Sequence, residues 1–200
     1  TGTGINSLYS MNFDSASLDY IDIGYSLNGL TAITYSFWVK ASSFKNWSYI
    51  ISAGNYANGE RLFGIYLDVN GSLEAYGGYG GGVIDSNIDL ASNTWYHLVV
   101  VYTNNKDVAF YVNGSPASTG SFSNTNLIAA NSSTRIGSYS GSVNNLFDGK
   151  IDEVAIFNRA LDSTERAALY DGSGSNIRPS NLMATDLNPL AYYPLGEQAQ

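Results

Sequence analysis

The chain has 200 residues, a formal net charge of −8, only 13% charged residues and no cysteine. Its nine Lys and Arg residues are scattered, which argues against a nucleic-acid partner, because neutralising phosphates requires clustered basic side chains. The lack of cysteine excludes disulfides, thiolate metal sites and cysteine nucleophiles. No segment approaches the ~20 apolar residues of a membrane span.

Short alternating runs of apolar and polar residues, bounded by Gly, Asn, Asp and Ser, recur along the chain. Such runs are typical of half-buried strands. In the run ITYSFWVKA, Phe37 and Val39 should face one side of a sheet, and Trp38 and Lys40 the other. We therefore predict an all-β domain with strands at Leu8–Phe13, Tyr20–Ile23, Ile33–Lys40, Tyr49–Ala53, Leu62–Val69, Ser72–Tyr76, Trp95–Tyr102, Val108–Val112, Thr134–Ser138 and Gly149–Phe157.

Three Asn-containing pairs predict tight turns between these strands. Asn70-Gly71 predicts a type I′ hairpin turn, in which both central residues need positive φ. Asn104-Asn105 predicts a similar link between the next long strands, and Asn113-Gly114 predicts another reversal of the chain.

One segment, LDSTERAALYDG, departs from the strand pattern. Asp162 can accept from the first turn of a helix while Glu165 completes a capping box. Leu161 and Leu169 contribute to an apolar face, and Gly172 is placed to end the helix. The sequence therefore predicts one short helix near the C-terminal end of the domain.

The composition changes after this helix. The run GSGSN is typical of a flexible linker, and two prolines follow it. We therefore divide the chain into a sandwich at 1–172, a linker at 173–189 and an extra strand at 190–200. The absence of an initiator Met indicates a processed or excised fragment.

Four segments together carry a resemblance to a known family: SMNFDSASLDYIDIG, ITYSFWVKA, NTWYHLVVVYTNNKDVAFYVNGSPAS and DGKIDEVAIFNRALDSTE. In this order, over roughly residues 8–172, they resemble laminin-G-like jelly-roll domains of the concanavalin A-like class. The resemblance implies a two-sheet antiparallel jelly-roll sandwich with one short C-terminal helix. It rests on core and turn residues, which specify a fold and do not specify a ligand.

Domains that this chain resembles usually begin with a strand of the form L-AYYPL-E, which here stands at the other end, as Leu190–Glu197. Two interpretations stay open. The tail is the start of the next repeat of a tandem array, as in the large structural proteins of marine bacteriophages that such junctions resemble. Alternatively, the tail completes this sandwich or a neighbour's by strand addition, with Tyr192, Tyr193 and Leu195 as assembly residues.

The same resemblance implies a structural Ca²⁺ held by an Asp of the last strand and oxygens near the first. Asp14 and Asp152 occupy the matching segments, and Ca²⁺ takes six to eight oxygen ligands. The alternative is that Asp14 caps a turn and that Asp152 pairs with Arg159 or Lys150.

Aromatic residues in turn-rich positions are the candidate ligand-binding residues. The run AYGGYGGGV lacks the strand-to-helix context and the lysine of a phosphate loop, but its two tyrosines suit sugar stacking or protein contact. The alternative for each aromatic residue is ordinary packing at a sheet edge. The full set is Trp47, Tyr56, Tyr76, Tyr79 and Tyr139.

Nothing in the sequence predicts catalysis. Retaining glycosidases need two carboxyl groups about 5–5.5 Å apart, and the adjacent Asp152 and Glu153 point to opposite faces of a strand. The only histidine, His97, matches a framework position and is expected to be a hydrogen-bonded structural residue. We therefore do not expect an enzyme.

By elimination, the sequence predicts a recognition or adhesion module that binds carbohydrate or protein as part of a larger extracellular or virion protein. The alternative is a structural assembly subunit, such as a capsid decoration, fibre or filament, that self-associates through its C-terminal strand.

Overall fold

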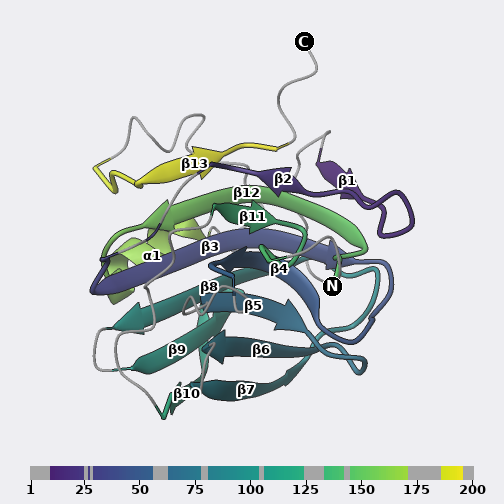
Figure 1. Ribbon diagram of the computed structural model, residues 1–200. Helices are drawn as coiled ribbons and strands as arrows, with labels where there is room; N and C mark the ends of the chain where they lie inside the picture. The colour runs from purple at the N-terminus through teal and green to yellow at the C-terminus, as the bar shows by residue number, and fades with distance from the viewer. Residues whose placement is uncertain are drawn as a thin grey trace.

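The computed structural model describes residues 10–24, 27, 29–55, 63–77, 81–103, 106–123, 133–141, 145–170 and 186–195. In this part of the chain, two antiparallel sheets pack face to face with one short helix (Figure 1). Sheet A has the order β1-β12-β3-β8-β9-β10, with β13 also paired to β12, and sheet B has the order β2-β11-β4-β5-β6-β7. This arrangement confirms the predicted all-β sandwich.

The ten predicted strands all form, several with shorter bounds. In sheet A the strands are β1 (Met11–Phe13), β12 (Gly149–Phe157), β3 (Ala32–Ala41), β8 (Tyr96–Thr103), β9 (Asp107–Val112), β10 (Ser115–Ser121) and β13 (Ala191–Tyr193). In sheet B they are β2 (Ile21–Asp22), β11 (Thr134–Ile136), β4 (Ser48–Ala53), β5 (Phe63–Leu67), β6 (Ser72–Gly77) and β7 (Gly82–Asp89).

Two strands that the sequence analysis missed, β7 and β10, lie at the edges of the two sheets. The sequence of β10, SPASTGS, contains no large apolar residue, and in β7 only Ile84 and Ser86 are buried. An edge strand has one neighbouring strand and can expose most of its side chains. Its sequence therefore need not show the apolar alternation on which the prediction depended.

The core lies between the sheets and is built by the predicted alternation. Phe37 and Val39 are fully buried, whereas Trp38 and Lys40 on the other side of β3 are half-buried. Burying one such large apolar side chain stabilises the fold by about 1.5–3 kcal/mol. The inward-facing side chains of both sheets form one continuous cluster, so the two layers form a single folded unit.

The turn between β5 and β6 differs from the predicted type I′ turn. Gly71 has φ +87°, but Asn70 does not have a positive φ. The Asp68 carboxylate accepts the backbone N–H groups of Asn70 and Ser72, each at 2.8 Å. These bonds favour a turn that starts at Asp68 and has glycine alone in the left-handed region.

The other two predicted turns have different outcomes. Asn113 and Gly114 both have positive φ, at 50° and 75°, as a type I′ turn between β9 and β10 requires. Asn104 and Asn105 lie outside the described residues.

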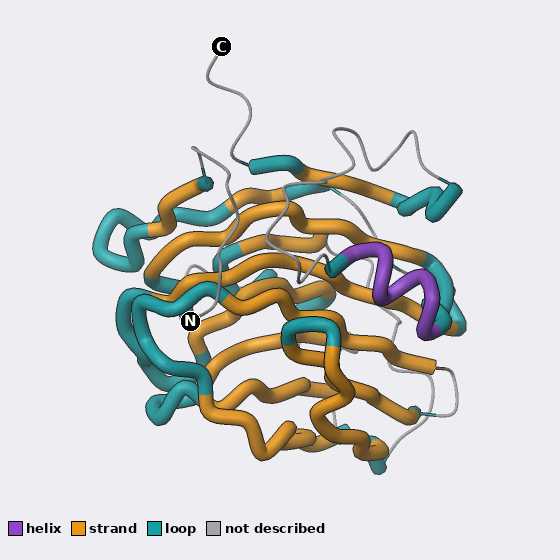
Figure 2. The backbone as a smooth tube through the Cα atoms, turned by 180° about the vertical axis from the view of Figure 1, so that it is seen from behind, coloured by secondary structure: helices purple, strands orange, loops and turns teal. Residues whose placement is uncertain are grey.

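The predicted helix is present as α1 (Ser163–Leu169). Asp162 Oδ1 accepts the Glu165 N–H, and the Glu165 carboxylate accepts the Asp162 N–H, both at 2.9 Å, which confirms the predicted capping box. Figure 2 shows α1 on the outer face of sheet A. In the described part of the chain, α1 is too short and too polar to cross a bilayer, and no other helix is described.

Candidate functional site

Five aromatic side chains gather over strands β4, β5 and β6 and form what we call the aromatic cluster: Trp47, Tyr49, Tyr66, Tyr76 and Tyr139. Tyr49 and Tyr66 are buried, whereas Trp47, Tyr76 and Tyr139 are partly exposed. The structure therefore brings together three of the predicted ligand-binding residues, and it adds two tyrosines that the sequence analysis missed.

Each ring is positioned by a different element. Tyr49 and Tyr66 are direct partners across β4 and β5. Tyr66 alternates with inward-facing Ile65 and must therefore project from the outer face of sheet B. Tyr76 projects from β6, while Trp47 immediately precedes β4 and Tyr139 follows β11.

The rings contact one another in three orientations: stacked, edge-to-face and tilted. Trp47 stacks on Tyr66 with centroids 4.9 Å apart and an interplanar angle of 15°, and it meets Tyr76 edge-on at 5.4 Å and 86°. Tyr49 lies between Tyr66 and Tyr139, at 5.2 and 5.6 Å. Stacked and edge-to-face pairs are favourable beyond their buried area, so the cluster is a preformed surface.

Gly64 makes room for this arrangement on β5. A Cβ atom at Gly64 would lie 2.5 Å from Cε1 of Tyr49, so the Tyr49 ring occupies the space where an outward side chain of β5 would stand. Trp47 has φ 62°, a left-handed conformation that is costly for a bulky residue, on the order of 1–3 kcal/mol. Its contacts with Tyr66 and Tyr76 help to hold this conformation.

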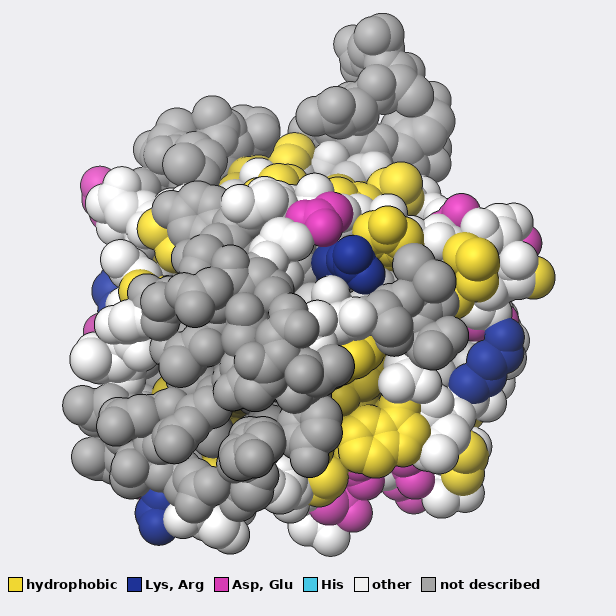
Figure 3. Space-filling view, viewed as in Figure 1, with side chains coloured by type: hydrophobic (Ala, Val, Ile, Leu, Met, Phe, Trp, Pro, Cys, Tyr) yellow, Lys and Arg dark blue, Asp and Glu magenta, His cyan; other side chains and the backbone are white. Residues whose placement is uncertain are grey.

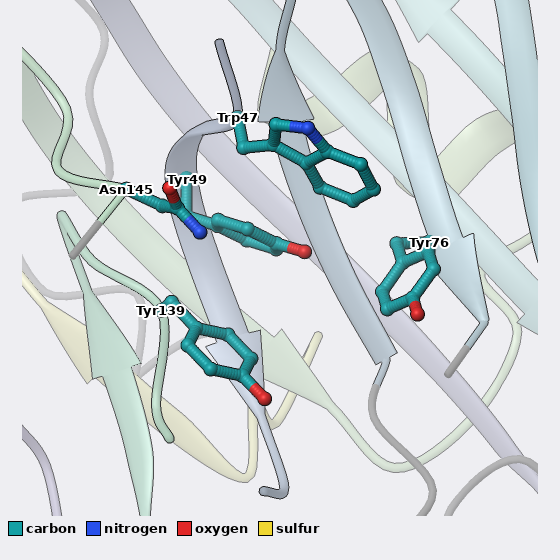
Figure 4. Close-up of a pocket in the computed structure, with 5 residues that line it drawn as sticks. All are labelled: Trp47, Tyr49, Tyr76, Tyr139 and Asn145. Carbon is teal, nitrogen blue, oxygen red and sulfur yellow. The ribbon is translucent and has the colours of Figure 1, made fainter. Parts of the chain in front are cut away.

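The cluster borders a shallow hollow of about 320 Å³ that is lined by Trp47, Tyr49, Tyr76, Tyr139 and Asn145 (Figure 4). In this view the hydroxyl group of Tyr49 points toward Tyr76, and the hydroxyl groups of Tyr76 and Tyr139 point away from Trp47, toward the bottom of the picture. The Asn145 side chain adds an amide, with both donor and acceptor capacity. The hollow thus combines flat apolar surfaces with several groups that can hydrogen-bond a hydroxyl.

One side of the cluster is acidic. Glu74 is the cross-strand partner of both Tyr66 and Asp85. Burial raises the pKa of Glu74, an effect that the nearby Asp68 and Asp85 carboxylates reinforce and the hydrogen bond from Tyr66 opposes. Figure 3 shows Asp and Glu side chains next to exposed hydrophobic side chains on this face of the molecule. These carboxylates create a negative potential at that side of the hollow.

Among the described residues, the guanidinium of Arg135 lies near the other side, and it is already engaged. Arg135 donates to the Tyr139 carbonyl at 3.4 Å and forms an ion pair with Asp22, also at 3.4 Å. It also lies over the ring of Tyr20, 4.5 Å from its centroid. Its charge is therefore largely neutralised before any ligand arrives.

The remaining predicted ligand-binding residues, Tyr56 and Tyr79, lie outside the described residues. Trp47 and Tyr139 can be predicted from the sequence because they stand next to turns. Tyr49 and Tyr66 cannot, because in the sequence an aromatic residue inside a strand is indistinguishable from a core residue. Gly64 within a strand is the signal that the sequence offers, since a glycine in a strand often marks a place where another group packs closely against the backbone.

The two residues of the predicted calcium pair, Asp14 and Asp152, lie apart in the structure, and the calcium site stays a prediction. Phe13 pairs with Gly149, which places Asp14 about four residues, or roughly 13 Å, from Asp152 along β12. Asp14 is exposed and accepts from the Ala16 N–H and the Ser17 hydroxyl, whereas Asp152 is fully buried. Among the described residues, no group of three or more His, Asp or Glu side chains could hold a metal ion.

Arg159, one of the alternative partners expected for Asp152, is engaged elsewhere. Arg159 forms its ion pair with Glu165 at 2.7 Å. Asp152 instead accepts the N–H of Glu153 at 3.0 Å. The turn-capping alternative for Asp14 agrees with its hydrogen bonds to Ala16 and Ser17.

His97 is a structural residue, as expected. It is 2% exposed, its Nε2 lies 3.0 Å from the Ser36 hydroxyl, and its ring stacks against Tyr170. Burial lowers the pKa of His97 to about 3. A neutral imidazole beneath Tyr170 is not placed to exchange protons with a ligand.

The predicted assembly residues Tyr192 and Tyr193 lie in this chain's own sheet A, and Leu195 follows them. Tyr192 pairs with Ala155 and Tyr193 with Val154, both on β12. Leu195 packs against the main core. The C-terminal strand therefore completes the sandwich to which it is covalently attached.

Comparison with solved structures finds the same fold in proteins of low sequence identity. The CBM40 module of the Ruminococcus gnavus IT-sialidase superposes with a TM-score of 0.66 at 16% identity, covering 86% of this chain and 100% of the module. A putative carbohydrate-binding protein from Bacteroides ovatus gives 0.65 at 18%, covering 96% and 53%. Domain 4 of AbnA, an extracellular arabinanase from Geobacillus stearothermophilus in complex with arabinotriose, gives 0.57 at 22%, covering 72% and 69%.

Other similar structures are much larger than this chain, which spans 26% of the length of the NanB sialidase from Streptococcus pneumoniae. No curated protein sequence matches the chain. The sequence model of one family matches residues 15–165, which include the strands from β2 to β12 and the start of α1. The chain belongs to the concanavalin A-like lectin/glucanases superfamily.

Proposed function

We propose that this domain is a non-catalytic carbohydrate-binding module and that its ligand occupies the hollow beside the aromatic cluster. The observation that carries this proposal is the convergence of Trp47, Tyr76 and Tyr139 on one hollow. The carbohydrate-binding modules with similar folds support it, although their identity to this chain is too low to transfer a ligand.

The chemistry of the hollow suits a sugar. The apolar face of a pyranose or furanose ring packs against an aromatic face, and the sugar hydroxyls hydrogen-bond at the edges of the site. Trp47 and Tyr76 meet at nearly a right angle, so they can contact two sides of one sugar unit. The three tyrosine hydroxyls and Asn145 then orient the ring.

The charges around the hollow favour a neutral glycan. The Glu74, Asp68 and Asp85 carboxylates would repel a sialic acid or a uronic acid. Arg135, the basic residue beside Tyr139, is paired with Asp22. Among glycans with the same core sugars, we therefore expect the uncharged form to bind more tightly than the carboxylated form.

A glycan array followed by calorimetric titration tests this function. Trp47→Ala should weaken the best neutral ligand at least tenfold, a loss of about 1.4 kcal/mol. Trp95→Ala is the matched control, because Trp95 is also half-buried but directly precedes β8 in sheet A. Absence of glycan binding, or equal weakening by both variants, would contradict the proposal. Binding of a protein and of no glycan would also contradict it, and would identify the domain as a protein-binding module.

We further propose that the domain acts as an adhesion module of a larger extracellular or virion protein. A module that binds sugar without cleaving it contributes by holding its carrier at a glycan surface. The arabinanase domain with a similar fold comes from an extracellular enzyme, and its structure is that of a complex with arabinotriose, which supports this context.

A second candidate function is assembly, and the C-terminal strand favours it. Strand β13 is held on β12 by a short ladder, and it follows α1 after a long intervening segment. Such a strand can join a capsid decoration, fibre or filament by strand addition. Light scattering at increasing protein concentration tests this function, because a subunit that assembles should not remain monomeric.

A further inference from the structure

One short strand, β13, covers half of the edge of β12 that faces away from β3. Residues Gly149–Ile151 of β12 pair with β1, and residues Val154–Ile156 pair with β13. Glu153, with φ 51°, separates the two halves at a bulge in the ladder to β3. Without β13, the backbone of Val154–Ile156 would be an open sheet edge, which is a template for another strand.

The segment 186–195 fits this edge on both of its faces. Toward the core, Leu190, Ala191 and Tyr193 pack against the main cluster. On the outer side, Leu187 and Tyr192 pack against a small second cluster. The members of that cluster are Ala155, Phe157, Leu161, Leu169, Leu187 and Tyr192.

Polar contacts fix the segment's register. The Arg159 guanidinium donates to the Leu187 carbonyl at 2.9 Å. The Tyr192 hydroxyl donates to the Glu153 carboxylate. Together with the ladder, these contacts make the edge a specific acceptor for this sequence.

The chain between α1 and this segment is much longer than the distance it has to cover. Leu169 at the end of α1 and Leu187 pack against the same small cluster, so the chain leaves and returns to one place. The intervening residues 170–186 have a contour length of roughly 55–60 Å at about 3.3–3.6 Å per residue. This length is sufficient for the segment to reach the β12 edge of another molecule.

We propose, on the basis of the assembly function proposed above, that segment 186–195 is an exchangeable strand and that its partner is the β12 edge of a second copy of this chain. The segment makes the same contacts with β12 of its own chain and with β12 of another chain. Exchange therefore loses only the entropic advantage of intramolecular binding. Tethering of a segment by a short linker generally corresponds to an effective concentration on the order of millimolar. Exchanged molecules therefore become populated near that concentration, or where a larger assembly holds copies side by side.

The lack of native cysteine allows a direct test on the full chain. Two variants are prepared separately, one A155C and the other Y192C, with distinguishable tags. Ala155 is 1% exposed beneath the segment and is the ladder partner of Tyr192. A disulfide between the two chains therefore requires that the segment of one lies on β12 of the other.

We expect the mixed variants to form a disulfide-linked heterodimer whose fraction rises with concentration and becomes substantial near 1 mM. The matched control pairs A155C with Y20C, because Tyr20 is exposed and lies outside both ladders of β12. This control should not cross-link. Cross-linking of both mixtures to the same extent would show random collision and overturn the proposal.

The double variant A155C/Y192C on one chain shows whether the pair geometry permits a disulfide. It should form an intrachain bond at low concentration. If it does so while the mixed single variants do not cross-link at 1 mM, the segment does not exchange and the proposal is wrong. Glycan binding is read separately, so this outcome leaves the proposed ligand function unaffected.

Discussion

At the scale of single residues, Gly64 determines the shape of the aromatic cluster. Its missing side chain leaves space on β5 for the ring of Tyr49, which in turn contacts Tyr66 and Tyr139. The site therefore depends on a residue that itself presents no side chain to a ligand.

We expect Gly64→Ala to weaken glycan binding and to lower the free energy of unfolding by about 1–3 kcal/mol, because the new methyl group displaces Tyr49. Gly120→Ala is the matched control. A Cβ at Gly120 would lie 2.4 Å from Ile84 Cγ2, away from the aromatic cluster. Both variants should lose stability in urea denaturation, but only the first should lose affinity. Equal affinities would contradict this role for Gly64.

His97 makes the fold sensitive to acid. Because burial lowers the pKa of His97 to about 3, the unfolded chain takes up a proton near pH 6.5 while the folded chain stays neutral. The contribution of neutral His97 to the free energy of unfolding is therefore fully present above pH 6.5 and is lost as the pH drops toward 3. At pH 5 the loss from this residue is about 2 kcal/mol, at about 1.4 kcal/mol for each pH unit.

The measurement is the free energy of unfolding at pH 7 and pH 5 for the parent chain and for His97→Gln. The variant should be less stable at pH 7 because it loses the packing of the imidazole. Its further decrease on going to pH 5 should be smaller than that of the parent, by about 2 kcal/mol. Equal decreases would show that His97 takes up its proton in the folded state.

The same scale shows what the sequence could reveal about the site. Trp47, Tyr76 and Tyr139 could be predicted because aromatic residues near turns are often exposed. Tyr49 and Tyr66 could not, because alternation fixes which residues share a face but not which face is buried. Asp14 and Asp152 were matched by segment, and only the register of β1 on β12 shows that they lie apart.

At the scale of elements, α1 is held at its N-terminus by its capping box. Asp162→Ala should lower the free energy of unfolding by about 1 kcal/mol, because the Glu165 N–H loses its acceptor. Asp162→Asn keeps an acceptor oxygen and should lower the free energy of unfolding by only a small part of the loss expected for Asp162→Ala. Thermal denaturation of the two variants and the parent measures the difference. A loss of equal size in both would assign the effect to charge and not to capping.

The long central strands and α1 could be predicted because each has a clear local signal. In β3 and β8 that signal is the apolar alternation of a half-buried strand, and in α1 it is the capping box. The edge strands β7 and β10 have no comparable signal, since their side chains are largely exposed. The turn at Asn70-Gly71 was assigned the wrong type because the Asp68 side chain competes for the backbone N–H groups.

At the scale of the whole molecule, the two outer sheet faces differ. Helix α1 and Leu187 cover part of the outer face of sheet A, where Ala155 and Phe157 are buried beneath them. The outer face of sheet B carries the aromatic cluster and its hollow. The proposed ligand site and the proposed strand exchange thus use separate surfaces, and binding at one need not block the other.

The way in which β13 and β1 share the edge of β12 has a consequence for the order of the chain. Tyr193 lies opposite Val154 and Met11 lies opposite Ile151, and both strands run antiparallel to β12. Strands β13 and β1 therefore lie end to end along β12, and the gap between Tyr193 and Met11 is roughly 10 Å. A short bridge from Leu195 to Ser10, with new ends opened in the segment after α1, would give a circularly permuted protein. That rearranged chain would keep every strand pair of the original and would read through β13 directly into β1.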